Sequence, residues 1–350
     1  MTGTDAAPWF TGQVRIAQIA PPWTPVPPPL YGGIELVVDR LCRGLVKAGH
    51  DVLLYTTGDS TCPVPKAWVL DHAEGERIGM AVPEIRHVLH AYDAMRDVDI
   101  IHDHTLFGPF YAQHFPDLKV VTTIHGPFND ELTDLYSRVA ARVPLICISH
   151  DQRRCAPQVP VAAVIHHGID AEDFPFGDGS GGYLLFLGRM APEKGPDRAA
   201  VVARKAGVPL IMAAKMREPW ERAFFDAEVA PLLSDDIRYL GEVPHERKLE
   251  LIAGARALLN PIRWHEPFGL VMTEALACGT PVISFAEGAA PEIIEHGKTG
   301  FLCADEAEMV DAVRRIGEID RRACRAVVEN YFSTTRMVDE HVKLFESILS

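Results

Sequence analysis

Two glutamates, seven residues apart, flank the predicted start of a helix. Glu266 lies in the loop that follows a predicted strand, and Glu274 lies about a turn and a half inside the next helix. Helix side chains tilt toward the N-terminus, and the unpaired amides there attract anions. The two carboxylates can therefore lie on either side of one bound diphosphate and accept hydrogen bonds from hydroxyl groups. Either glutamate alone is typical of an ordinary helix start.

Two cations occur in the segment GRMAPEKG, residues 188–195. Arg189 ends the first predicted strand of the second half of the chain, and Lys194 precedes the next helix. The carboxyl ends of parallel strands meet at one edge of a sheet, so both cations should reach the edge that carries Glu266. Two cations there suit a leaving diphosphate without a metal ion. The patterns GxxxxGK[ST] and GxGxxG are absent, which argues against a nucleotide hydrolase or a dehydrogenase.

Strand and helix signals alternate twice along the chain. In the first half we expect strands at 14–20, 51–57, 99–103, 119–124 and 145–149, with helices at about 34–48, 83–96, 107–114 and 129–141. In the second half we expect strands at 183–187, 208–213, 237–240, 257–260 and 281–285, with helices at about 195–206, 219–230, 245–254 and 267–277. Such alternation is typical of βαβ units with parallel sheets.

The fold class we predict is α/β, with two doubly wound, Rossmann-like domains that face each other across a cleft. The amino-terminal domain is expected at 1–170, a hinge or linker at 171–182, the second domain at 183–333, and a final helix at 334–350 that packs back on the first domain. Ligands of such sheets bind beyond the carboxyl ends of the strands, so the cleft is the expected site.

Composition narrows the function classes. The 350 residues carry a net charge of −14, which disfavours nucleic acid as a partner, although a local basic patch leaves weak peripheral contact with a membrane open. No apolar run is long enough to cross a membrane. Residues 1–12 lack the pattern of a signal peptide, so we expect a cytoplasmic protein. The seven cysteines form no CxxC and are typical of reduced, buried thiols.

We expect no metal site. His102 and His104 are two residues apart at a strand end, which permits a metal but is more typical of loop and pocket histidines. The triplet 97–99 (DVD) resembles a metal-binding DxD motif. It precedes its strand instead of following it, so we interpret it as a solvated turn.

Several motifs together resemble the retaining glycosyltransferases of family 4, a group that includes glycogen synthases and mannosyltransferases. EPFGLVMTE resembles the E-x7-E motif of that family, and GRMAPEKG, YLGEVPHERKLELIAGARALLNP, EALACGTPVIS and PEIIEHGKTGFL follow the family in order. YGGIE, IHDH and TTIHG match it in the first half. The resemblance spans about residues 14–345 and implies the GT-B fold, with an acceptor-binding first domain and a donor-binding second domain.

The resemblance also implies site residues. The catalytic set is His125, Arg189, Lys194 and Glu266, and the donor-binding set is Gly32, Gly33, Val243, Phe268, Gly269, Leu270, Val271 and Glu274. In this assignment Glu266 faces the donor hexose, Glu274 the ribose, and His125 the anomeric centre. Arg189 and Lys194 hold the diphosphate, and the base lies against residues 242–244.

The implied reaction is transfer of a hexose, from UDP-hexose or GDP-hexose, to an acceptor hydroxyl with retained configuration. Front-face substitution needs no protein nucleophile, no metal and no other cofactor. The acceptor is a small molecule, a glycan or a lipid-linked molecule. Two alternatives stay open: a nucleotide-sugar epimerase of the same fold, which would convert the free donor, and a catalytically silent sugar-nucleotide binding protein. The second is disfavoured because His125, Arg189, Lys194, Glu266 and Glu274 are all present.

Overall fold

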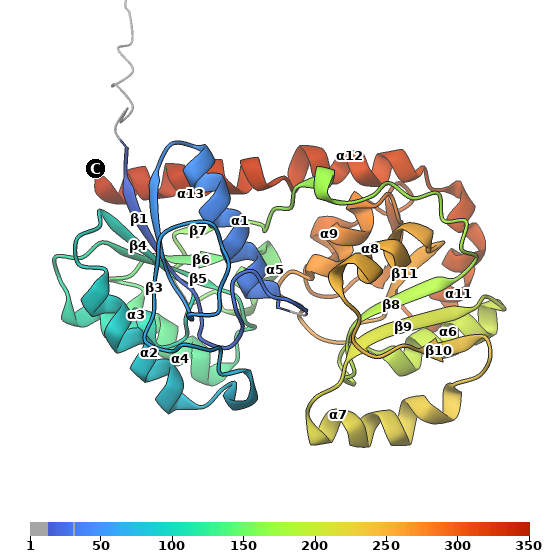
Figure 1. Ribbon diagram of the computed structural model, residues 1–350. Coiled ribbons are helices and arrows are strands. Elements are labelled where there is room, and N and C mark those ends of the chain that lie inside the picture. The colour runs from blue at the N-terminus through green and yellow to red at the C-terminus, as the bar shows by residue number, and fades with distance from the viewer. Residues whose placement is uncertain (1–12, 31) are drawn as a thin grey trace, which may run out of the picture.

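The computed structural model of the protein describes residues 13–30 and 32–350. Residues 1–12, in which we expect no signal peptide, and Tyr31 of the YGGIE motif lie outside the described residues. The chain forms two α/β domains side by side, each built on a parallel sheet (Figure 1). The predicted fold class is confirmed.

The first domain contains a seven-stranded parallel sheet in the order β3-β2-β1-β4-β5-β6-β7. Its strands are β1 (Arg15–Ile19), β2 (Asp51–Tyr55), β3 (Lys66–Ala67), β4 (Ile100–Asp103), β5 (Val120–Ile124), β6 (Leu145–Cys147) and β7 (Ala163–Val164). Helices bury both faces, since successive side chains of a strand point to opposite sides. Ile16 packs with α1 (Gly33–Lys47), and the next residue, Ala17, packs with α2 (Ala81–Ala94).

The second domain has a six-stranded parallel sheet in the order β10-β9-β8-β11-β12-β13. Its strands are β8 (Leu184–Arg189), β9 (Leu210–Lys215), β10 (Ile237–Tyr239), β11 (Ala257–Asn260), β12 (Val282–Phe285) and β13 (Gly300–Cys303). In both sheets the strand order reverses beside the first strand, at β1/β4 and β8/β11. Crevices that bind ligands open at such switch points.

The remaining helices surround the two sheets. In the first domain they are α3 (Gly108–Tyr111), α4 (Asp130–Val139) and α5 (His150–Cys155). In the second they are α6 (Pro196–Ala206), α7 (Pro219–Phe224), α8 (His245–Gly254), α9 (Leu270–Ala277), α10 (Ala290–Ile293), α11 (Glu306–Arg315) and α12 (Arg321–Tyr331). No helix among the described residues is long and apolar enough to span a membrane.

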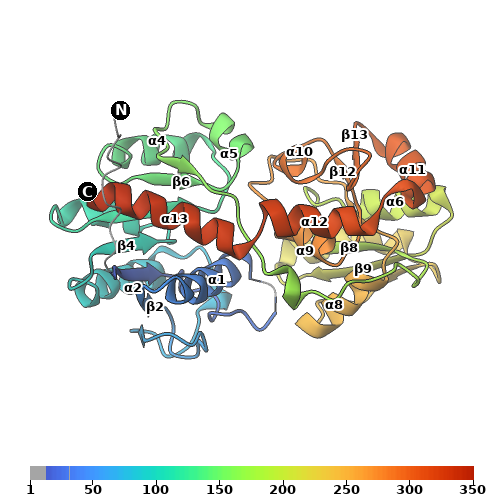
Figure 2. The ribbon, with the colours of Figure 1, turned by 90° about the horizontal axis from the view of Figure 1, so that it is seen from above.

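The last helix, α13 (Thr334–Leu349), leaves the second domain and lies along the first (Figure 2). Met337, Val338 and Phe345 of α13 belong to the apolar cluster that holds α1. The helices approach closely at Gly44, where an added Cβ would lie 2.5 Å from Val338 Cγ2. The two chain segments that connect the domains also pair with each other, since Ile169 N donates to Phe332 O at 2.8 Å.

The expected elements differ from the observed ones in a few places. β3, β7 and β13 have no counterpart among the expected strands, and β3 and β7 are only two residues long. The helix expected at 267–277 begins at Leu270, because Gly269 has φ +88, which does not fit inside a right-handed helix. The helix expected at 219–230 ends as an α-helix at Phe224 and continues as a π-helical turn, Phe225–Val229.

Candidate active site

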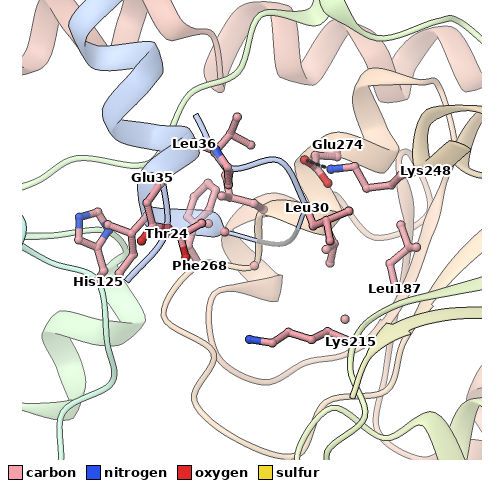
Figure 3. Close-up of a pocket in the computed structure, with 18 of the residues that line it drawn as sticks. Thr24, Leu30, Glu35, Leu36, His125, Leu187, Lys215, Lys248, Phe268 and Glu274 are labelled. Carbon is pink, nitrogen blue, oxygen red and sulfur yellow. Dashed lines mark hydrogen bonds and ion pairs between the residues drawn. The ribbon is translucent and has the colours of Figure 1, made fainter. Parts of the chain in front are cut away.

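A cavity of about 380 Å³ opens between the two domains. Its walls come from the carboxyl-end loops of both sheets, including Ile148 after β6, Leu187 in β8 and Asn260 in β11. Eleven of the twelve predicted site residues line it, namely Gly32, Gly33, His125, Lys194, Val243, Glu266, Phe268, Gly269, Leu270, Val271 and Glu274. Figure 3 shows Glu35 and His125 on one side, with Lys215, Lys248 and Glu274 on the other.

The loop before α9 positions the first glutamate of the E-x7-E motif. Gly269 adopts a left-handed conformation and forms the N-cap of α9, and Gly269, Leu270 and Val271 line the cavity at this helix start, where the first amides have no partner within the helix. The carboxylate of Glu266 accepts a hydrogen bond from Trp264 Nε1 at 2.9 Å and forms an ion pair with Lys194. This arrangement gives an anion-binding helix end with a carboxylate and a cation beside it.

The second glutamate of the motif is also paired with a lysine. Glu274 lies inside α9, is 3% exposed, and accepts from Lys248 Nζ of α8 at 2.7 Å. The sequence analysis missed this lysine and also Lys215, which extends into the cavity from the end of β9 (Figure 3). Lys215 was detectable, because it lies two residues after the predicted strand 208–213, at the edge that carries Arg189. Nothing in the spacing of Lys248 and Glu274 indicates their contact.

Arg189 is the predicted site residue that does not line the cavity. Its guanidinium donates to Glu193 Oε1 at 2.7 Å, lies 3.7 Å from Glu221 Oε1, and is 5.8 Å from the ring centre of Trp220. The Glu221 carboxylate is itself held by the backbone amides of Arg217 and Glu218. Contact of Arg189 with a diphosphate therefore requires its side chain to leave these acidic partners, and its role stays a prediction.

His125 is held in the first-domain wall by a chain of hydrogen bonds. His104 Nδ1 lies 2.8 Å from His125 Nε2, and His104 Nε2 lies 2.8 Å from Gln18 Oε1. Burial lowers the pKa of both imidazoles, that of His125 to about 3, so both are neutral near pH 7. The amide oxygen of Gln18 accepts a hydrogen bond from His104 Nε2, so the neutral His104 carries no proton on Nδ1. His104 Nδ1 then accepts from His125 Nε2, and His125 Nδ1 remains an acceptor.

The pair His102 and His104 belongs to this buried network. His102 Nε2 lies 2.7 Å from Thr123 Oγ1, and the ring centres of His102 and His104 are 4.1 Å apart. Among the described residues, potential metal-ligand atoms gather elsewhere, at His150, His166 and Glu292 and at Asp151, Cys155 and His265.

Those two groups lie where the domains touch. Glu292 of α10 accepts hydrogen bonds from the amides of His150 and Asp151, at 2.8 and 2.7 Å, and contacts His166 Nε2 at 2.7 Å. His265, just before Glu266, contacts Asp151 Oδ2 at 3.0 Å. Residues of both groups therefore already have protein partners in the opposite domain, and these contacts join the two domains.

Gly288 packs closely against the backbone of Glu266. An added Cβ at Gly288 would lie 2.5 Å from Glu266 N and 2.7 Å from its carbonyl oxygen, and backbone atoms cannot yield as a flexible side chain can. We expect Gly288→Ala to displace the loop and to lower kcat/KM at least about tenfold, since roughly 1.4 kcal/mol of transition-state binding is a factor of ten.

The matched control for Gly288→Ala is Gly297→Ala. Gly297 has a similar positive φ of +77, but nothing lies within 4 Å of its added Cβ. Both variants therefore carry the same kind of backbone strain, and only the first has the collision. Equal kcat/KM values for the two variants would show that the contact with Glu266 does not matter.

Glu35 is a nearly buried acid on the first-domain wall. It lies in the first turn of α1, is 5% exposed, and lines the cavity. Burial raises its pKa to about 7, against smaller opposing effects of its own backbone amide and the charge of Lys215. No hydrogen bond or ion pair joins its carboxyl to another side chain in the described part of the chain.

The raised pKa of Glu35 predicts how stability depends on pH. The carboxyl has a pKa near 4.5 in the unfolded chain and about 7 in the folded protein. The folded state therefore binds the proton more tightly, and stability falls as pH rises from 4.5 to 7. The loss is about 3 kcal/mol and persists above pH 7. We expect Glu35→Gln to unfold at a higher temperature than the wild type at pH 8 but not at pH 5. An equal difference at both values would contradict the raised pKa.

Two family models match this chain. The model described as "Glycosyltransferase Family 4" matches residues 31–173, and the model described as "Glycosyl transferases group 1" matches residues 176–331. The glycogen synthase of Mycobacterium tuberculosis is 28% identical over 349 aligned residues, which cover 83% of each chain.

Solved structures of similar fold cover nearly the whole chain. Sucrose-phosphate synthase from Thermosynechococcus elongatus superposes with a TM-score of 0.80 at 19% identity, covering 96% of this chain and 99% of the other. HepE from Anabaena, solved in complex with UDP and glucose, superposes with a TM-score of 0.77 at 17% identity, covering 96% of this chain and all of the other. At these identities the likeness supports the two-domain fold.

Proposed function

The chain belongs to the group 1 glycosyltransferases of family 4, and from this premise we propose that it transfers a hexose from UDP-hexose or GDP-hexose to an acceptor hydroxyl with retention of configuration. The first domain, within 1–170, would hold the acceptor, and the second, within 183–333, the donor. The hinge would lie at 171–182, and the helix at 334–350 would anchor the second domain to the first.

One observation carries the proposal. Glu266, Lys194 and the exposed amides of α9 share one cavity with Glu274 on one wall and His125 on the other. This set offers a carboxylate for sugar hydroxyls, a cation and a helix end for the diphosphate, and a second carboxylate for the ribose. HepE, which has this fold, binds UDP and glucose.

The lysines take part in a proposed exchange of partners. Lys194 pairs with Glu266 and Lys248 with Glu274, so each motif carboxylate is neutralised by a lysine. When a donor enters, its hydroxyls would take over the carboxylates and its diphosphate would attract the lysine side chains. The cations would then lie where negative charge develops as the bond to the leaving group breaks.

The transfer itself would proceed as a front-face substitution. The acceptor oxygen forms a bond to the anomeric carbon on the face from which the diphosphate departs. The bond from that carbon to the diphosphate oxygen breaks, and a leaving phosphate oxygen takes the proton of the acceptor hydroxyl. The protein's part is to hold both substrates and stabilise the leaving charge. Lys194 and the α9 amides would supply that charge stabilisation, so no metal ion would be required.

Thermal unfolding with nucleotides tests the donor site. UDP, GDP, ADP, TDP and CMP are each added with and without EDTA. A ligand at a hundred times its dissociation constant stabilises a protein by about 2.7 kcal/mol, which raises the midpoint by degrees. We expect selective stabilisation by UDP or GDP that EDTA does not change. Absence of any shift, or a shift lost with EDTA, would contradict the metal-free donor site.

The matching nucleotide sugar then separates the reactions. We expect nucleoside diphosphate release to rise when acceptor is present and the product to retain the anomeric configuration of the donor. Interconversion of the free donor with an isomeric nucleotide sugar, without any acceptor, would identify an epimerase. Binding without turnover in either assay would identify a silent binding protein.

A further inference from the structure

The first-domain wall of the cavity differs in character from the second-domain wall. Trp23, Pro28, Leu30 and Ile78 give it an apolar surface, and its titratable side chains among the described residues are Glu35, His125 and His167. None of the described lining residues of this wall is a lysine or an arginine. The second-domain wall instead presents three lysines, Lys194, Lys215 and Lys248.

The side chains of the first-domain wall therefore offer no cation to an anion. The N-terminus of α1, where Gly32 and Gly33 line the cavity, is assigned to the donor phosphates. His125 and His167 carry no charge near neutral pH, because burial lowers the pKa of each below its ordinary value. The remaining group, Glu35, is an acid. A phosphate or carboxylate placed on this wall would lose water without gaining a cation from it, and desolvating an unpaired charge is strongly unfavourable. The lysines of the other wall lie where the donor diphosphate is proposed to bind.

The apolar character continues out of the cavity to the surface. Leu30 and Ile78 line the cavity, yet they are 43% and 54% exposed. Met80 and Val82 follow Ile78 along the chain at the start of α2 and are 52% and 70% exposed. An acceptor whose hydroxyl points toward His125 could thus lay an apolar group across these side chains, where burial of apolar surface is favourable.

Glu35 is the polar group that this wall offers to a hydroxyl. Its carboxyl lies beside the Gly32 backbone, since a Cβ added there would be 3.1 Å from Oε2. It lines the same cavity as His125, on the first-domain side (Figure 3). Burial destabilises the ionised form of this carboxyl, and no described side chain pairs with it. A hydrogen bond from a ligand hydroxyl would therefore stabilise it, because that hydrogen bond replaces the lost water.

We propose that the first-domain wall is a subsite for an uncharged acceptor, in which a hydroxyl-bearing ring is joined to an apolar group and Glu35 accepts a hydrogen bond from a ring hydroxyl. The apolar group lies against Leu30 and Ile78. This inference rests on the proposed transferase function and deepens it, because it names the class of acceptor. It excludes sugar phosphates and other anionic acceptors.

The test uses pairs of acceptors that differ only in charge. Phenyl and octyl glycosides of glucose, galactose and mannose are compared with their 6-phosphates, using the full-length protein and the donor that the nucleotide screen selects. We expect a neutral glycoside to react with kcat/KM at least about tenfold above its phosphate, a difference worth 1.4 kcal/mol. Phosphates used equally well, or no neutral glycoside used at millimolar concentration, would overturn the proposal.

Two variants test the role of Glu35. We expect Glu35→Gln to lower kcat/KM for the neutral acceptor about tenfold, mainly through KM for that acceptor, because a hydrogen bond to a carboxylate is stronger than one to an amide. The control is Glu131→Gln, which changes an exposed glutamate in the first turn of α4. An unchanged acceptor KM in Glu35→Gln would remove Glu35 from the subsite.

Donor measurements without acceptor keep the two proposals apart. The same protein samples are assayed for stabilisation by the nucleoside diphosphate and for slow hydrolysis of the donor by water. If both are absent, the proposed transferase function fails. If both are present and the acceptors show no preference for the neutral members, only the acceptor subsite fails.

Discussion

Replacement of Glu266 by glutamine is expected to lower transfer by roughly two to three orders of magnitude while nucleoside diphosphate affinity stays nearly unchanged. Each charge-assisted hydrogen bond to a sugar hydroxyl contributes about 1.5–3 kcal/mol, and a carboxylate can accept two. Glu266 also pairs with Lys194, so its loss frees that lysine for the diphosphate and does not weaken nucleotide binding. The measurement compares kcat/KM with the dissociation constant of the nucleoside diphosphate.

The matched control for Glu266→Gln is Glu228→Gln, which changes an exposed glutamate of the π-helical turn after α7. We expect this variant to behave as the wild type in both assays. If Glu266→Gln weakened nucleotide binding as much as transfer, Glu266 would not face the sugar, and the assignment of the two motif carboxylates would have to be exchanged.

Lys194→Ala is expected to weaken both nucleoside diphosphate binding and transfer, and transfer more strongly. The ammonium group is proposed to contact the diphosphate before reaction and to stabilise the larger charge that develops as the bond breaks. We expect the affinity for the nucleoside diphosphate to fall about tenfold and kcat/KM to fall by roughly two to three orders of magnitude. Isothermal titration and initial rates provide the two values.

A further titration shows whether Lys194→Ala acts through the loss of the positive charge or through a disturbance of the site's structure. The variant leaves Glu266 without its lysine in a largely buried place, and the loss of this ion pair also destabilises the site. The corresponding nucleoside, which has no phosphates, should bind the variant as it binds the wild type. A parallel loss for the nucleoside would show that Lys194 only supports the fold. Lys205→Ala, an exposed lysine at the end of α6, is the control for charge removal.

The two walls of the cavity differ in charge, and the predictions for Glu266, Lys194 and Glu35 all follow from this difference. The second-domain wall holds lysines and glutamates in ion pairs, which a diphosphate sugar is proposed to rearrange. The first-domain wall holds neutral imidazoles, apolar groups and Glu35, whose ionised form burial destabilises. Glu35 lowers the stability of the folded protein near neutral pH, and residues with such a cost are typically kept where they serve function. Glu35→Gln should therefore be more stable and less active, two effects that a purely structural residue would not combine.

The sequence by itself determined the two-domain α/β class and the family. Both signals are local: the order of strands and helices follows from periodicity within short windows, and the motifs are contiguous in the chain. The position of Glu266 in a loop just before a helix was also predictable from the sequence. The exact start of α9 was not, since helix ends depend on the φ of single residues.

Only the tertiary structure decided which charges meet. Lys248 reaches Glu274 across 26 residues of sequence, and Gln18 reaches His104 across 86. Arg189 instead turned to Glu193 and Glu221, away from the cavity lining. The pKa of Glu35 depends on how completely α1 and the facing domain exclude water from its carboxyl. Pairing and desolvation depend on distances between segments remote in sequence, and these distances exist only once both sheets have formed and α13 holds the second domain to the first.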